Sequence, residues 1–390
     1  MIPNEYRYLL ELLRCAVSGS APPSFPQDIS PDAVFRIAQR NDVFLLAFES
    51  AMHLDAVRDH PSFSAWQECY LRRITRTVNQ TYELEHLDRL LSEERIEHIF
   101  LKGSCLRQMY PRPELREMCD IDILIPTERE ADALAAVKRD GYELQEGLTT
   151  SHNTELFKRP FQVLELHTYL VPKETRFFPY YASIWERAEK PHKSYTDALS
   201  LEDQYIFLLV HLQKHYDYGG TGIRSILDIA VFEAAVGDKL DRAYIHDELA
   251  KLELTDFAND VTVLAAHWFD RHTDELTPSQ SKTANRILFS TTYGTMEQKQ
   301  SNLLKHKMDG GKSERRVKIG LFLRQVFPNR EFMRGWFAWI DRYPCLLPAA
   351  WIARWCCLLV KKPRSLLEHY RWVRGLHLMQ DERDEMNGKK

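Results

Sequence analysis

Two aspartates separated by a single isoleucine are the first residues in this sequence whose spacing indicates chemistry. They open the segment Asp120-Ile121-Asp122-Ile123-Leu124-Ile125, which has the alternation and the apolar β-branched residues of a strand. In a strand, alternate side chains share a face, so Asp120 and Asp122 project together with Cα atoms roughly 6.6 Å apart. Like charges so placed repel unless a cation compensates them, and the pair therefore predicts a site for Mg²⁺ or Mn²⁺.

A third carboxylate and a glycine-serine pair accompany these aspartates. Glu165 and His167 share one face of the apolar run Val163-Leu164-Glu165-Leu166-His167. The pair Gly103-Ser104 follows the apolar run Ile99-Phe100-Leu101 and precedes a short predicted helix. A glycine lets a phosphate approach the backbone, helix N-terminal amides donate hydrogen bonds to it, and Lys102 adds a positive charge.

The ordered set predicts phosphoryl-transfer chemistry that depends on two metal ions. Asp120, Asp122 and Glu165 are expected to hold two metal ions, with Glu165 also accepting the proton of the attacking hydroxyl. Each piece alone has an ordinary explanation, because Asp-x-Asp arises by chance and Gly-Ser is a common turn. The order of strand, Gly-Ser, helix, Asp-x-Asp strand and later acidic strand makes the set informative.

This order resembles the nucleotidyltransferase superfamily, whose fold is shared by DNA polymerase beta and kanamycin nucleotidyltransferase. Within it, Lys102-Gly103, Tyr110-Pro111, Arg116 and Asp120-Ile-Asp122 look like the bacterial family described as uncharacterised nucleotidyltransferases. The resemblance covers roughly residues 5–360, although only the 100–125 and 163–167 motifs are specific. One departure is Glu165, where many relatives have Asp; the longer side chain leaves its distance from the aspartate pair open.

The resemblance also implies roles for residues outside the central motifs. It includes Glu165-x-His167, and it implies that these residues and four later ones face the nucleotide-binding cleft. The four later residues are His211, His215, Arg224 and Asp228.

Each of these residues has an alternative explanation that the sequence leaves open. Arg116 either binds a phosphate bidentately or forms a salt bridge that holds the loop 111–119. His211 and His215 have the i, i+4 spacing of a zinc pair but lack a third ligand nearby, so contact with nucleotide or acceptor, or a buried structural role, fits better. Arg224 and Asp228 have the spacing of an ordinary helical ion pair.

The elements that must position these residues fall into three regions. Apolar residues recur at helical spacing over residues 1–95, short strands with one helix (128–138) fill 96–195, and helical spacing returns over 196–390. We predict an α+β fold in which a small mixed nucleotidyltransferase sheet is embedded in a mainly helical chain. With 390 residues, several packed units are expected.

Charge is distributed unevenly along the chain. The formal net charge of -4 combines 19 Lys and Arg against 9 Asp and Glu in residues 305–390 with 33 against 47 in residues 1–304. The basic region also holds five of the eight tryptophans: 336, 339, 351, 355 and 372. A helical core is the favoured explanation; peripheral membrane contact and stacking of single-stranded nucleic acid are the alternatives.

We therefore predict a magnesium-dependent nucleotidyltransferase that transfers a nucleoside monophosphate to an unknown acceptor, which is a small molecule, glycan, protein or RNA. Alternatives are a toxin-like enzyme acting on tRNA and a catalytically silent binding protein with this fold. The most apolar late segment, 345–360, is interrupted by Arg354 and is too short to span a bilayer. The N-terminal residues do not have the pattern of a secretory signal, and we expect a cytoplasmic protein.

Overall fold

The computed structural model describes residues 2–144, 152–190, 194–270, 275–291, 314–330, 333 and 337–361. Its contacts form two compact units: Met1–His215 with Thr221–Tyr293, here called the larger unit, and Tyr216–Gly220 with Gly294–Lys390, here called the C-terminal unit. Each is described by itself.

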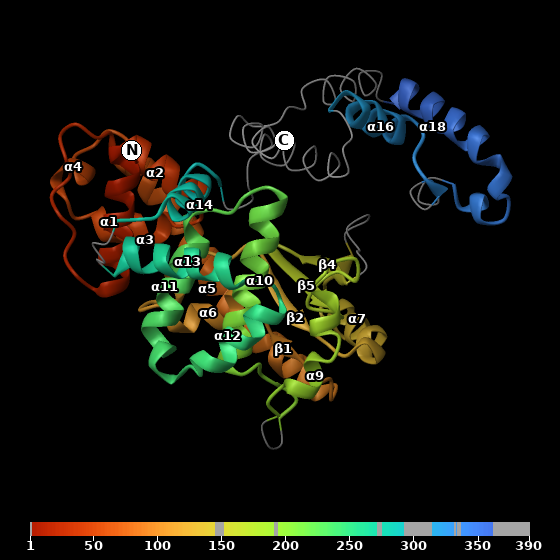
Figure 1. The fold of residues 1–390 in the computed structure, drawn as a ribbon, viewed down its shortest axis with the longest axis horizontal. Helices are drawn as coiled ribbons and strands as arrows, with labels where there is room; N and C mark the ends of the chain where they lie inside the picture. Colours follow the sequence, from red (N-terminus) through yellow and green to blue (C-terminus); the bar gives the residue numbers. More distant parts are fainter. Residues whose placement is uncertain are drawn as a thin grey trace. The chain divides into compact units, whose positions relative to one another are not determined.

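Five helices precede the sheet, as the helical spacing of this region predicts. The apolar residues of α1, including Leu9 and Leu13, are fully buried, and Pro31 begins α2 at a position where no intrahelical amide is needed. The helices are α1 (Asn4–Ser18), α2 (Pro31–Arg40), α3 (Phe44–Ala51), α4 (Asp55–Arg58) and α5 (Phe63–Glu93). The long α5 passes behind the sheet (Figure 1).

A mixed five-stranded sheet lies in the middle of the larger unit, in the order β1-β2-β5-β4-β3. The strands are β1 (Ile99–Phe100), β2 (Ile121–Leu124), β3 (Glu143–Leu144), β4 (Asn153–Lys158) and β5 (Gln162–His167). The pair β2–β5 is parallel, and the pairs β1–β2, β4–β5 and β3–β4 are antiparallel. A small mixed sheet within a mainly helical chain confirms the predicted α+β class.

The two faces of the sheet differ in chemistry. On one face, Ile121, Ile123, Leu164 and Leu166 are buried against apolar side chains of α5 and of α7 (Glu130–Arg139). Because strand side chains alternate, Asp122, Glu165 and His167 occupy the opposite face. Burial of the apolar face thus fixes the register that presents the acidic residues together.

Short helical segments connect these strands. They are α6 (Gly103–Leu106), η1 (Arg107–Met109), η2 (Pro113–Leu115), η3 (Thr127–Arg129), α8 (Phe178–Tyr181) and α9 (Ile184–Arg187). The predicted helix at 128–138 is thus present as η3 followed by α7, and the short helix expected after Gly103-Ser104 already begins at Gly103.

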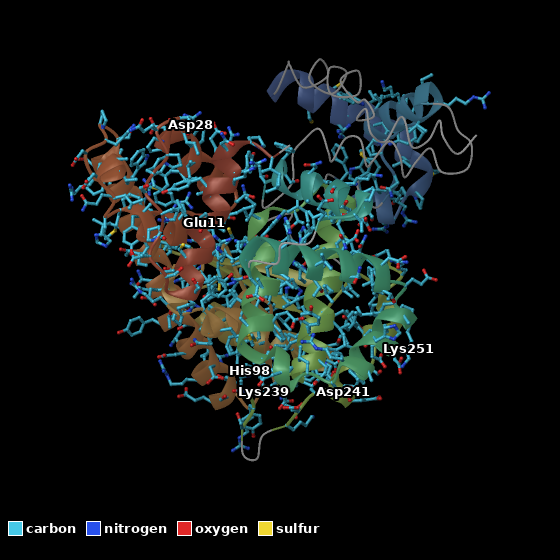
Figure 2. The ribbon with its side chains drawn as sticks, turned by 60° about the vertical axis from the view of Figure 1, so that its left-hand side comes forward. Glu11, Asp28, His98, Lys239, Asp241 and Lys251 are labelled. Atoms are coloured by element: carbon cyan, nitrogen blue, oxygen red, sulfur yellow. The ribbon has the colours of Figure 1, made fainter. Side chains whose placement is uncertain are left out.

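Helices resume after Ser200, whose hydroxyl accepts a hydrogen bond from the Asp203 amide at 3.1 Å, as in half of a capping box. They are α10 (Leu201–Tyr218), α11 (Ile223–Val236), η4 (Gly237–Lys239), α12 (Arg242–Lys251), α13 (Thr255–Phe269) and α14 (Pro278–Leu288). Asp241, labelled in Figure 2, caps α12 by accepting bonds from the amides of Ala243 and Tyr244, both at 3.0 Å.

The described part of the C-terminal unit contains α16 (Glu314–Val326), η5 (Ala338–Asp341), η6 (Pro344–Leu346) and α18 (Leu347–Lys361). The indole nitrogens of Trp351 and Trp355 donate hydrogen bonds to the carbonyls of Pro328 and Val326, each at 2.8 Å. These two tryptophans pack within the unit, whereas Trp339 is partly exposed. Trp336 and Trp372 lie outside the described residues. None of the described helices combines the length and hydropathy needed to cross a membrane.

Candidate active site

The acidic face of the sheet is centred on the parallel pair β2–β5. In this pair Asp122 lies directly opposite Glu165, and Leu124 lies opposite His167. Asp120 immediately precedes β2, and Lys102 follows β1, the neighbouring strand on the other side. Three strands therefore bring five chemically active side chains to one place.

Asp122 is the most heavily hydrogen-bonded carboxylate of this group. Its Oδ1 atom accepts bonds from Lys102 Nζ at 2.6 Å and from His167 Nε2 at 2.7 Å. His167 Nε2 also lies 3.2 Å from Glu165 Oε2, which accepts a bond from Asn153 Nδ2 at 2.8 Å. The two carboxylates are thus joined through one imidazole.

Charge and burial separate the pKa values of these groups. Burial alone would raise the pKa of Asp122, but Lys102 and His167 outweigh it and hold that pKa below its ordinary value. For Asp120, burial and the charge of Asp122 raise the pKa to about 6. Burial would lower the pKa of His167, but its bonds to the carboxylates raise it. Such divergent values are typical of functional sites.

A cavity of about 340 Å³ opens in front of this face. Asp120, Asp122 and Glu165 line it from the sheet, together with Lys102 and Gly103. Helices α10 and α11 contribute the remaining predicted cleft residues: His211, His215, Arg224 and Asp228. His167 and Arg116 also line the cavity, so the structure gathers eleven of the twelve residues singled out from the sequence around one space, with Ser104 as the exception.

The donor atoms present fit a divalent cation. One ligand atom from each of Asp122, Glu165 and His167 lies within 4.8 Å of the others. Carboxylate oxygens are the ligands that Mg²⁺ and Mn²⁺ prefer, and the raised pKa of Asp120 marks a negative charge that a cation would stabilise. The group spaced to hold a metal thus consists of Asp122, Glu165 and His167, and Asp120 lines the same cavity.

Arg116 forms a buried salt bridge, which is one of the two roles that the sequence left open for it. Its Nε and Nη2 atoms bind both oxygens of Asp228, each at 2.8 Å, and the Tyr110 hydroxyl donates to the same carboxylate at 2.7 Å. All three side chains are buried. This pair ties the loop 111–119 to α11, so two of the guanidinium nitrogens expected to bind phosphate are already engaged.

Gly103 is required by the position of Arg116. A Cβ atom at Gly103 would overlap Arg116 Nη1 and lie 3.1 Å from Met118 Cγ. The absence of a side chain therefore admits the guanidinium beside the turn. Ser104 is buried, and its hydroxyl has no hydrogen-bond partner among the described residues, yet it lies outside the set that lines the cavity. Phosphate contact by Ser104 stays a prediction.

The histidines of α10 lie side by side in the cavity wall. Their ring centroids are 4.4 Å apart, and burial lowers the pKa of His211 well below its ordinary value, with Lys102 adding to the effect. Within the described chain, the groups spaced to hold a metal do not include this pair. Arg224 binds the Asp42 carboxylate at 3.3 Å and the Glu117 carbonyl at 3.2 Å.

Two further residues that line the cavity, Asn153 and Lys214, do not belong to the motifs of the sequence. Asn153 lies opposite His167 in the β4–β5 pair, and its bond to Glu165 positions that carboxylate. Lys214 follows His211 by three residues on α10 and lines the cavity. The i+3 spacing from His211 on one helix could have indicated that Lys214 faces the cavity. The position of Asn153 could not be predicted in this way, because it depends on how β4 pairs with β5.

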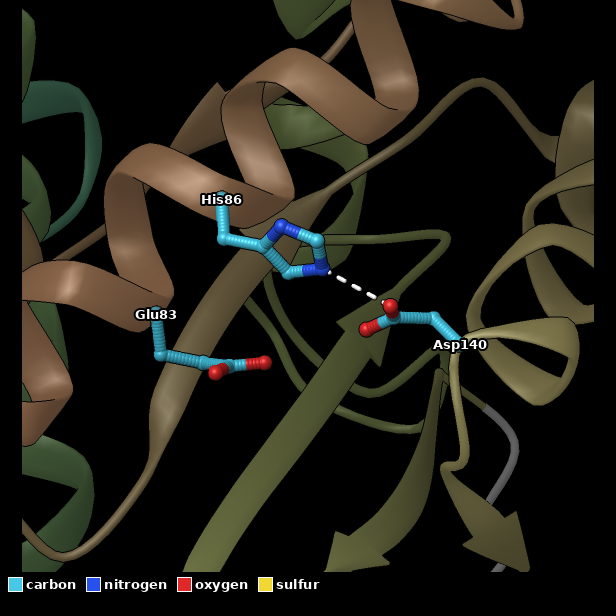
Figure 3. A group of neighbouring side chains, drawn as sticks. All are labelled: Glu83, His86 and Asp140. Carbon is cyan, nitrogen blue, oxygen red and sulfur yellow. Dashed lines mark hydrogen bonds and ion pairs between the residues drawn. The ribbon is translucent and has the colours of Figure 1, made fainter.

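A second group of acidic and imidazole side chains, Glu83, His86 and Asp140, lies apart from this cavity, between α5 and the segment after α7 (Figure 3). Lys158 already binds Glu83 Oε1 at 2.9 Å and Asp140 Oδ2 at 2.8 Å, while His86 Nε2 lies 2.8 Å from Asp140 Oδ1. Lys158 compensates part of the negative charge of this group, and the group fastens α5 to β4.

Comparison with known proteins agrees with this arrangement. No curated protein matches the chain. The model of a family described as "Uncharacterised nucleotidyltransferase" matches residues 27–270, which include every residue that lines the cavity. The family supports nucleotidyl transfer as the general activity, and the chain belongs to this uncharacterised nucleotidyltransferase family.

Proposed function

We propose that this protein transfers a nucleoside monophosphate from a nucleoside triphosphate to an acceptor hydroxyl or phosphate and releases pyrophosphate. The observation that carries the proposal is the register of Asp122 opposite Glu165, with Asp120 adjacent, at one wall of the cavity. Asp120, Asp122 and Glu165 would hold Mg²⁺ or Mn²⁺. A bound divalent cation stabilises the charge that develops on the transferred phosphoryl group.

The chain's own residues would perform the remaining work. The acceptor oxygen attacks the α-phosphorus, the bond to the bridging oxygen of pyrophosphate breaks, and Glu165 accepts the acceptor proton. The bonds of Asn153 and His167 to Glu165 Oε2, at 2.8 and 3.2 Å, would orient that carboxylate for the transfer. Lys102, bonded to Asp122, would keep this carboxylate ionised.

Asp122→Asn tests the role of the central carboxylate. We expect magnesium-dependent binding of a non-hydrolysable triphosphate, measured by calorimetry, to weaken more than about 100-fold, because loss even of groups that only support a metal ligand costs about 10- to 100-fold. Asp238→Asn, an exposed carboxylate in η4, is the control and should bind as the wild type does.

The same titration separates this proposal from the silent binding protein. A wild-type protein that binds no triphosphate with magnesium or manganese would favour the silent fold. Equal binding by wild type and Asp122→Asn would remove Asp122 from the metal site while leaving nucleotide binding in place.

A further inference from the structure

Four permanently cationic side chains line the cavity, and three of them are already paired. Lys102 Nζ lies 2.6 Å from Asp122 Oδ1, Arg116 holds Asp228 with two bonds of 2.8 Å, and Arg224 binds Asp42 at 3.3 Å. These pairs leave little positive charge for a polyanionic ligand. The fourth cation is Lys214.

Lys214 has no hydrogen-bond or ion-pair partner within the described chain, although Asp122 and Glu165 are close enough to perturb its charge. Its side chain is half-buried on α10, next to His211. Burial lowers the pKa of Lys214, and the positive charge of Lys102 lowers it further. A partly desolvated ammonium group without a direct ion-pair partner costs folding free energy, and such groups gather where a ligand supplies the missing charge.

The proposed function supplies such a ligand. A nucleoside triphosphate carries about four negative charges near neutral pH, and most of them are on its β and γ phosphates. Even with a cation on the carboxylates of β2 and β5, the triphosphate keeps excess negative charge, so a further positive side chain in the cavity favours its binding. Lys214 lines the cavity from α10, together with His211 and His215.

We infer that Lys214 binds the β or γ phosphate of the triphosphate, as the only cation in the described cavity wall without an acidic partner. The inference rests on the proposed function and adds a residue to it that the sequence did not select. It also moves to Lys214 the phosphate contact that the sequence assigned to Lys102, because Lys102 bonds Asp122. His211, kept neutral by burial, lies beside this contact as a hydrogen-bonding group.

Lys214→Met in the full chain tests the assignment, because methionine keeps the apolar stem and removes the charge. The probes are the β,γ-imido analogues of the four ribonucleoside triphosphates, and the matching monophosphates, titrated with magnesium by calorimetry. We expect triphosphate affinity to fall about 10- to 100-fold, as for loss of a charge-assisted hydrogen bond. Monophosphate affinity should change less than about twofold, since the β and γ phosphates are missing.

Two further variants guard against a structural explanation. Lys214→Arg keeps the charge and should recover at least half of the lost affinity on a logarithmic scale. Lys239→Met alters an exposed lysine in η4, labelled in Figure 2, and should bind as the wild type does. Thermal unfolding of ligand-free Lys214→Met should occur at or above the wild-type temperature, because an uncompensated charge has been removed.

The outcomes are distinct. No triphosphate binding by the wild type would overturn the proposed function together with this inference. Wild-type affinity in Lys214→Met, or equal losses for triphosphate and monophosphate, would overturn the inference alone.

Discussion

The carboxylates of the cavity respond to their surroundings in opposite ways. Asp122 accepts hydrogen bonds from Lys102 and His167, and its pKa lies below the ordinary value. Asp120 is buried beside the charge of Asp122, and its pKa rises to about 6. At neutral pH the folded protein therefore keeps Asp120 ionised at a cost in folding free energy, which a bound cation would offset.

Asp120→Asn is expected to stabilise the metal-free protein at pH 8. The folded pKa of about 6 lies above the ordinary 3.8, so the stability that Asp120 contributes is present below 3.8 and is lost as pH rises through 6. The variant should gain roughly 1 to 3 kcal/mol in free energy of unfolding at pH 8, and the gain should shrink toward pH 4. Urea unfolding at several pH values measures it.

Magnesium provides the internal control for this prediction. Saturating magnesium should stabilise the wild type more than Asp120→Asn, because the variant has lost a charged ligand. A gain that is the same at pH 4 and pH 8 would contradict the assigned pKa.

At the scale of elements, the Arg116–Asp228 pair connects three parts of the larger unit. It joins the loop 111–119 to α11, and Arg116 Nη1 lies against Gly103 at the start of α6. Asp120 follows this loop directly, so its position depends on where the loop is fastened. Breaking one partner of a buried ion pair generally costs about 3 to 5 kcal/mol, because the remaining charge stays buried.

Gly103→Ala should reveal this connection as a coupling energy. The new methyl group would push Arg116 from Asp228, and the variant should lose about 1 to 3 kcal/mol of unfolding free energy. In an Arg116→Met background the same change should cost less, since the guanidinium is gone. A double-mutant cycle by urea unfolding measures the difference.

The matched glycine is Gly320, which has open space around its Cα on an exposed face of α16. Gly320→Ala should be neutral or stabilise by up to about 1 kcal/mol. Costs of Gly103→Ala and Arg116→Met that add within about 0.5 kcal/mol would show that the two sites are independent.

At the scale of the whole molecule, the uneven charge coincides with the division into units. Every residue that lines the cavity belongs to the larger unit, while the basic, tryptophan-rich residues belong to the C-terminal unit. Trp351 and Trp355 use their indole nitrogens in packing contacts there. This favours a helical core over a stacking platform for these two tryptophans.

A chain ending at residue 293 is expected to retain magnesium-dependent triphosphate affinity within about threefold of the full protein, because every residue that lines the cavity belongs to the larger unit. Calorimetry with an imido triphosphate measures it, and circular dichroism confirms that the shortened chain is folded. A folded fragment with affinity lowered more than about tenfold would show that residues 294–390 contribute to the nucleotide site.

The sequence by itself determined the strand alternation that puts Asp122 and Glu165 on one face. It also marked the order of motifs that resembles the nucleotidyltransferases, because both features depend on residues close in the chain. Only the tertiary structure identified the partner of Arg116, because Asp228 is 112 residues away in the chain. The need for glycine at position 103 also required it, because the neighbour that a Cβ atom would meet there is the folded Arg116 side chain. The unpaired Lys214 became visible in the same way, since a charge is uncompensated only with respect to all the neighbours that folding brings to it.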